Sequence, residues 1–161
     1  MRRLITICVA VMLFRPPSVL AGTWTTLDAP GAYRALPNGV DGSNIVGQYD
    51  DASGEHGFLY DGSSWTTLDY PGTGQTIARD INGNNIVGEY KTNINSSDSH
   101  AFLYDGTTWT TLPDIAGSIS WREAMGICGS TIVGQYVDGA WNWDGFRFDG
   151  TSMTAFTTGS G

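Results

Sequence analysis

The chain has few of the residues on which common functional sites depend. Its 161 residues include 2 cysteines, 2 histidines and 8 lysines plus arginines. Two cysteines give no disulfide framework, and no cysteine–histidine spacing typical of a zinc site occurs. The 16 acidic residues leave a formal net charge of −8, and a surface of that sign repels phosphate backbones and anionic lipid. We therefore expect neither nucleic acid nor a membrane surface as a partner.

Long apolar runs are also scarce, and the most prominent one lies at the start of the chain. Residues 4–14 are apolar apart from Thr6, follow a basic Met-Arg-Arg start, and precede a small residue at Ala21. The run is about half of the roughly 20 residues that a membrane-spanning helix needs. This layout predicts a signal peptide over residues 1–21 and a secreted or periplasmic protein without a membrane span after cleavage. Cys8 would leave with the signal, so Cys128 would be the remaining thiol.

Motifs of common enzymes are missing as well. The sequence has no Gly-x-Ser-x-Gly elbow and no glycine-rich phosphate loop. Carboxylates are plentiful, but no pair is distinguished from the others, so acid–base chemistry stays open without a candidate. We expect no cofactor, no metal and no catalytic residue.

An internal repeat with a period of about 44 residues dominates what remains. One marker is Trp-Thr-Thr-Leu, with a degenerate Met-Thr-Ala-Phe copy, and it starts at Trp24, Trp65, Trp109 and Met153. A second marker is Ile-Val-Gly-(Gln/Glu)-Tyr, which starts at Ile45, Ile86 and Ile132. A third marker is Phe-(Leu/Arg)-(Tyr/Phe)-Asp-Gly, which starts at Phe58, Phe102 and Phe146. The markers keep one order, which predicts repeats near 22–62, 63–106 and 107–150 and a partial repeat at 151–156, together forming one domain over 22–161.

Each repeat holds four short runs rich in β-branched and aromatic residues, with two tight turns between them. One turn is Asp-Gly plus two small residues, and the other places Asp41, Asn82 or Cys128 before a glycine. Cys128 therefore occupies a turn position, which we interpret as drift rather than as a nucleophile. Four antiparallel strands per repeat are typical of a β-propeller blade, so we predict an all-β repeat protein. The tight turns should share one end of the strands and the variable loops the other, where binding residues tend to lie.

The order "IVGxY…FLYDGxxWxxL" resembles the kelch motif of β-propellers. It is more similar to bacterial extracellular repeats named HAF after a His-Ala-Phe signature, here His100-Ala101-Phe102, with His56-Gly57-Phe58 one repeat earlier. The third repeat departs from it, with Asp144-Gly145-Phe146. The likeness covers nearly all of residues 23–156. It implies an exported, propeller-like repeat protein and no particular activity.

The repeat count does not reach a closed ring. If the N-terminal three runs and a C-terminal run complete one shared blade, the pattern gives three blades with one run left over, whereas a closed propeller typically has about 4–8 blades. Self-association completing a ring, a fragment of a longer array, and an open stack of sheets all fit the pattern. We favour a partial propeller that is completed only by partners or by missing sequence.

Candidate ligand-binding residues are those that the repeat does not copy. Trp141 and Trp143 lie in a variable loop, where aromatic rings suit stacking on a sugar ring or on an apolar patch of a partner. The preferred interpretation is that the two rings pack beneath the loop or continue the following strand outward. Tyr70 in "DYPG" is a companion candidate.

Two acidic residues, Asp50 and Asp51, are further candidates within the loop 49–57. The loop lacks the alternating spacing of a calcium loop, so a solvated acidic loop is the preferred interpretation. His56 and His100 stand at equivalent repeat positions, which indicates an anchor for a strand rather than a shared metal site.

These observations favour a secreted, non-catalytic repeat protein that serves as a binding or interaction scaffold for a carbohydrate or protein ligand. The alternative is a glycan-directed lectin or hydrolase that uses the variable-loop face. A truncated copy without independent function is the third interpretation.

Overall fold

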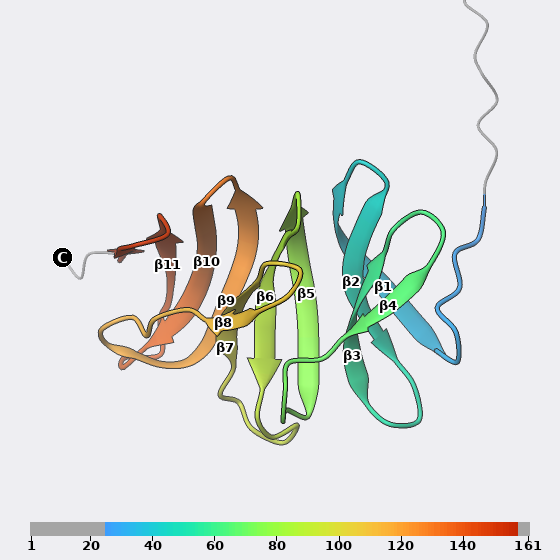
Figure 1. The fold of residues 1–161 in the computed structure, drawn as a ribbon. Helices are drawn as coiled ribbons and strands as arrows, with labels where there is room; N and C mark the ends of the chain where they lie inside the picture. Colours follow the sequence, from blue (N-terminus) through green and yellow to red (C-terminus); the bar gives the residue numbers. More distant parts are fainter. Residues whose placement is uncertain (1–24, 158–161) are drawn as a thin grey trace, which may run out of the picture.

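The computed structural model describes residues 25–157, and this part of the chain is built from β-strands (Figure 1). The predicted signal peptide at 1–21 and Trp24 lie outside the described residues. Within 25–157 there is no helix suited in length and hydropathy to crossing a membrane. The all-β prediction is confirmed.

Twelve strands follow one another along the described chain. They are β1 (Arg34–Asp41), β2 (Asn44–Asp50), β3 (Glu55–Tyr60), β4 (Trp65–Leu68), β5 (Gln75–Asn82), β6 (Asn85–Lys91), β7 (His100–Tyr104), β8 (Trp109–Thr111), β9 (Ser118–Cys128), β10 (Thr131–Asp138), β11 (Trp143–Phe148) and β12 (Met153–Phe156).

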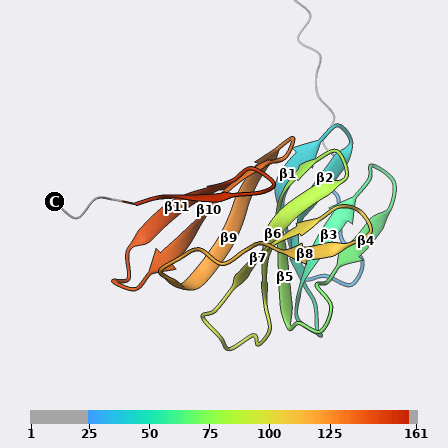
Figure 2. The same ribbon diagram turned by 60° about the vertical axis from the view of Figure 1, so that its left-hand side comes forward.

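Consecutive strands pair antiparallel in three groups of four, which we call the first unit (β1–β4), the second unit (β5–β8) and the third unit (β9–β12). One parallel pair, Glu55 with Gln75, joins the first two units into an eight-stranded sheet, and the third unit is a separate four-stranded sheet. The second unit lies between the other two in both views (Figures 1 and 2).

The strand predicted at residues 24–27 does not form over residues 25–27. Later copies of this run, in β4, β8 and β12, pair with the strand that precedes them in their own unit. The first copy has no such preceding strand among the described residues, so its backbone has no ladder to join. As a result, the hydrogen-bonded units start at β1, β5 and β9 and are offset from the repeats expected from sequence.

Asp-Gly turns close the hairpin between the last two strands of each unit. In the first unit, Asp61 Oδ1 accepts hydrogen bonds from the backbone N–H groups of Ser64 at 2.7 Å and Ser63 at 2.8 Å. Those bonds lower the pKa of Asp61. Gly62 follows with a φ of 97°, which glycine adopts without steric cost. The repeated aspartates are therefore parts of the turns.

Neighbouring units meet through apolar side chains and through the other set of turns. Val46 of the first unit is fully buried in one cluster with Ala78 and Ile81 of the second. At the turns, Asp41 Oδ2 accepts a hydrogen bond from Gly83 N at 2.7 Å, and Asn82 Oδ1 accepts one from Gly129 N at 2.8 Å. The side chains at the predicted turn positions thus also connect each unit to the next. Cys128, the third-unit equivalent, is exposed.

The variable loops lie at the opposite end of the strands from these turns, as predicted. Antiparallel pairing within a unit places its first and third connections at one end and its second at the other. Figure 1 shows the β5–β6 and β9–β10 turns at the upper edge and the β6–β7 loop at the lower edge. Residues of the lower loops can therefore present side chains on a common end of the molecule.

Candidate ligand-binding site

Three tryptophans, two exposed and one half-buried, form an aromatic surface at the variable-loop end of the third unit. The ring of Trp121 lies 6.3 Å from that of Trp141 and 6.1 Å from that of Trp143, centroid to centroid. Trp141 is 67% exposed and Trp143 is 52% exposed. We call these three residues the tryptophan surface. Trp141 lies in the loop between β10 and β11, and Trp143 is the first residue of β11.

The loop that carries Trp141 is organised by Asp138. Its Oδ1 accepts hydrogen bonds from the backbone N–H groups of Ala140 and Asn142, both at 2.8 Å. These bonds, that from Asn142 first, lower the pKa of Asp138. Trp141 N donates to the Asp138 carbonyl at 3.0 Å, and Trp141 has a φ of 63°. The ring is thus presented by an ordered turn.

Trp121 reaches the surface through an irregularity in β9. Between the pairs Gln135–Glu123 and Val137–Ser120, two residues of β9 oppose a single residue of β10. Trp121 is one of the two, and its φ is 45°. Such a β-bulge redirects a side chain, and a bulky residue in the left-handed region costs on the order of 1–3 kcal/mol. Two of the three tryptophans are therefore held in backbone conformations that glycine would adopt more easily.

The chemistry that this surface offers is contact with flat or ring-shaped apolar groups. Exposed tryptophan faces stack on the C–H faces of sugar rings and on aromatic or aliphatic side chains of a partner. Among residues 25–157 no group of three or more histidine, cysteine, aspartate or glutamate side chains is arranged to hold a metal ion.

The other predicted site residues have partners in the first two units. Asp50 forms an ion pair with Arg34, and Asp51 Oδ1 accepts hydrogen bonds from the backbone N–H of Ser53 at 2.7 Å and its hydroxyl at 2.6 Å. Tyr70 packs inside the second unit and stacks on Tyr90. The structure therefore does not gather these three residues with the tryptophan surface, and each has a structural role where it lies.

Both histidines lie at the start of a strand, His56 as the second residue of β3 and His100 as the first of β7, and their contacts anchor it there, as expected from their repeat positions. His56 stacks on Tyr49 at 5.1 Å between centroids, and its Nδ1 lies 3.0 Å from the Asp69 carboxylate. His100 stacks on Tyr90 at 5.3 Å.

Sequence reasoning missed Trp121. The residue lies six positions before Ile127, and Arg34 and Gln75 take the same place before Val40 and Ile81 in the other units. A non-copied aromatic residue at a repeat position was the available signal, but the bulge that turns its ring toward Trp141 is not visible in the pattern.

Comparisons with known proteins give no relative for this chain. No protein-family model, no curated protein and no solved structure matches it.

Proposed function

We propose that the chain is an exported, non-catalytic binding module whose ligand contacts the tryptophan surface. The observation that carries the proposal is the backbone of Trp121 and Trp141, which has a positive φ at two bulky residues whose rings meet at the surface. Strained backbone conformations persist when the rest of the structure holds them, and they cluster at functional sites. Export is supported by the predicted signal peptide and by the resemblance to HAF repeats.

The proposal includes a propeller-like arrangement in which each unit is one blade. It is supported by the four antiparallel strands of each unit and by the packing of β5 against both β1 and β9, the equivalent first strands. Closed propellers typically have about 4–8 blades, so three units leave two open ends.

The two open ends expose residues that are buried wherever two units meet. On the first unit, Val40 is 67% exposed, whereas its second-unit equivalent Ile81 is 4% exposed. On the third unit, Val133 is 45% exposed, whereas Val46 and Val87 are fully buried. We call the exposed residue Val40 the leading face and the exposed residues Val133 and Phe156 the trailing face.

The trailing face of one copy is built to receive the leading face of another. The positions of Val40, Val133 and Phe156 already pack together inside the chain, as Ile81, Val46 and Leu68 at the first joint and as Ile127, Val87 and Leu112 at the second. A head-to-tail joint repeated around a two-fold axis closes a ring, and two copies would supply six blades. Arg147 stands where Leu59 and Leu103 stand in the other units, so we expect this joint to be weaker than the internal ones.

A glycan-directed protein, lectin or hydrolase, is the second candidate, and exposed neighbouring tryptophans favour it. We would screen the purified chain on a glycan array and assay the bound glycans for hydrolysis, in parallel with the variants Trp141→Gly and Trp143→Ala. Glycine suits the φ of 63°, so Trp141→Gly removes the ring while keeping the turn. Glycan binding that both variants lose supports a lectin, and product formation supports a hydrolase. Absence of glycan binding removes this candidate and leaves a protein ligand.

A further inference from the structure

In the second unit, the side chains of Tyr90, Phe102, Trp109 and Thr111 form the walls of a slot. This unit also shows which side chain fits into it. There the slot is filled by Tyr70 from the connection between β4 and β5. The Tyr70 ring stacks on Tyr90 at 3.8 Å between centroids and 14° between planes, and meets Trp109 edge-on at 5.4 Å. The Tyr70 hydroxyl lies 2.8 Å from Thr111 Oγ1.

The first unit repeats the walls of this slot. Tyr49, Phe58, Trp65 and Thr67 take the places of Tyr90, Phe102, Trp109 and Thr111. The Phe–Trp centroid distance is 4.8 Å in the first unit and 4.9 Å in the second. The distance from tyrosine hydroxyl to threonine Oγ1 is 2.9 Å and 2.8 Å, respectively. The two frames therefore match residue by residue and in geometry.

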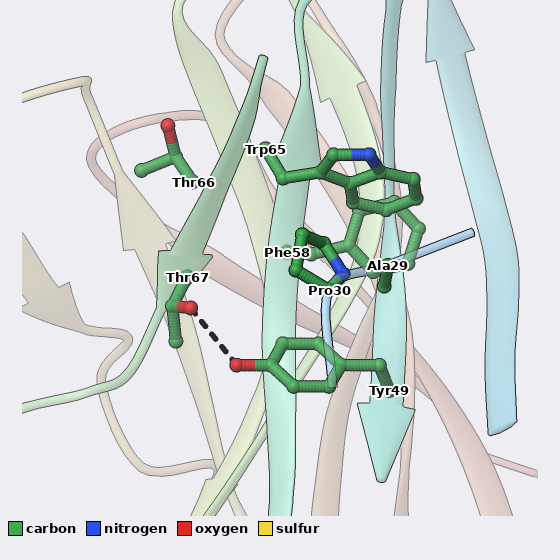
Figure 3. A pocket seen from close by; sticks show the side chains of 7 residues that line it. All are labelled: Ala29, Pro30, Tyr49, Phe58, Trp65, Thr66 and Thr67. Atoms are coloured by element: carbon green, nitrogen blue, oxygen red, sulfur yellow. Dashed lines mark hydrogen bonds between the residues drawn. The ribbon is translucent and has the colours of Figure 1, made fainter. Parts of the chain in front are cut away.

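The filling residue differs. "LDAPG" in the first unit places Ala29 where "LDYPG" places Tyr70. A cavity of about 220 Å³ opens beside Ala29 and is lined by Tyr49, Phe58 and Trp65. Figure 3 shows Trp65 and Tyr49 on opposite sides of it, with Ala29 and Pro30 drawn between them. An apolar cavity of about 150 Å³ binds benzene, so this volume accepts one substituted aromatic ring.

The polar end of the slot distinguishes a phenol from a plain hydrocarbon. In the second unit, Thr111 Oγ1 lies within hydrogen-bond distance of two phenol groups, those of Tyr70 and Tyr90, each at 2.8 Å. A threonine hydroxyl has one donor and two acceptor positions, so it serves both. In the first unit, Thr67 Oγ1 has the Tyr49 hydroxyl as its phenol partner. The hydrogen-bonding position that Thr111 uses for the Tyr70 hydroxyl is therefore available at Thr67 for a second phenol.

We propose that the first-unit cavity binds a phenol ring, either the tyrosine side chain of a peptide or a small para-alkylphenol. The ring stacks on Tyr49 beside Trp65, and its hydroxyl bonds to Thr67, as Tyr70 does with Tyr90, Trp109 and Thr111. In the third unit Ile115 is buried in a cluster with Tyr136 and Phe146, so the chain itself fills this slot there too. The inference concerns a different unit from the tryptophan surface and stands independently of it.

The test is a titration of the ¹⁵N-labelled purified chain, followed by NMR at the Trp65 indole N–H, which a Trp65→Phe variant assigns. The probes are 4-methylphenol, the blocked peptide Ac-Tyr-Pro-Gly-NH₂ and toluene. We expect saturable shifts of the Trp65 signal with 4-methylphenol and weaker binding of toluene by about tenfold. A peptide that also saturates the site identifies a tyrosine ligand, whereas binding of 4-methylphenol without the peptide identifies a free phenol.

Two variants keep the test decisive. Ala29→Tyr supplies the missing ring, and it should abolish the Trp65 shifts while the melting temperature stays equal or rises. Tyr70→Ala opens the matching slot in the second unit, and it should add 4-methylphenol shifts at the Trp109 indole. Absence of saturable shifts at Trp65 in the folded chain, equal binding of toluene, or unchanged binding by Ala29→Tyr would each overturn the proposal.

Discussion

Glu89 is 3% exposed, and its carboxylate accepts a hydrogen bond from Arg79 Nε at 3.0 Å. Burial raises the pKa of Glu89 to about 7, although Arg79 acts in the opposite direction. Gln48 and Gln135 occupy the same position in the other two units. The charge at this position is therefore particular to the second unit, whereas a polar side chain is common to all three.

This raised pKa predicts a pH-dependent stability. Between the unfolded value of 4.5 and about 7, the folded chain keeps a proton that the unfolded chain has lost. The free energy of unfolding therefore falls as the pH rises through this window, and the total loss assigned to Glu89 is on the order of 3 kcal/mol. Urea unfolding at about pH 5 and about pH 8 measures it.

Glu89→Gln is the matched variant, because glutamine is the residue of the other units. We expect the variant to lose the part of the pH dependence that Glu89 causes. The difference in free energy of unfolding between wild type and variant should therefore change between about pH 5 and about pH 8. A difference that stays constant from about pH 5 to about pH 8 would show that Glu89 titrates alike in the folded and unfolded chains.

The slot residues make a second prediction at this scale. Ala29→Tyr should raise the free energy of unfolding by about 0.5–2 kcal/mol, because it fills a cavity whose walls already fit that ring. Tyr70→Ala should lower it by about 3 kcal/mol, because it empties the equivalent slot. Thermal and urea unfolding of both variants test the pair, and destabilisation by Ala29→Tyr would show that the two slots are not equivalent.

At the scale of single elements, backbone strain lies at the β9 bulge, and we associate this strain with binding. At the β9 bulge, Trp121→Gly should be about 1 kcal/mol more stable than Trp121→Ala, because only glycine accepts the φ of 45° without cost. Urea unfolding of the two variants is the measurement. Equal stabilities, or an alanine variant that is the more stable, would mean that Trp121 is not strained in solution.

The strands and their hairpins could be predicted from the sequence, because each carries its own local signals. Alternating β-branched and aromatic residues mark the strands, and Asp-Gly pairs mark turns such as that at Asp61. The strand expected at residues 25–27 does not form because a strand needs a pairing partner, and a local pattern does not contain that information.

The site could be predicted only in part, for a related reason. Trp141 and Trp143 stand out because the repeat does not copy them, whereas the ring of Trp121 joins them through a bulge. In the sequence, Tyr70 is one residue of a variable loop. Only the structure shows that its ring fills the slot of the second unit.

At the scale of the whole molecule, the account rests on three equivalent units with two unsatisfied ends. The interior joints bury Val46 and Val87 completely, whereas Val133 and Val40 at the ends are exposed. The hydrogen bonds between turns follow the same pattern. The side chains of Asp41 and Asn82 each accept a hydrogen bond from the next unit, whereas Cys128, at the same position of the third unit, is exposed. The exposed apolar side chains at the two ends would gain hydrophobic stabilisation if a second copy covered them, although Arg147 should make that joint weaker than the internal ones.

Light scattering on the purified chain after size exclusion tests this central claim most directly, with Val133→Asp and Val40→Asp as matched variants on the two faces. The account predicts a discrete species of twice the chain mass for the wild type at micromolar concentration. It predicts the mass of one folded chain for either variant, because a buried, unpaired carboxylate at the joint is costly. A wild-type chain that has the mass of one copy at every concentration, or variants that keep the doubled mass, would contradict it.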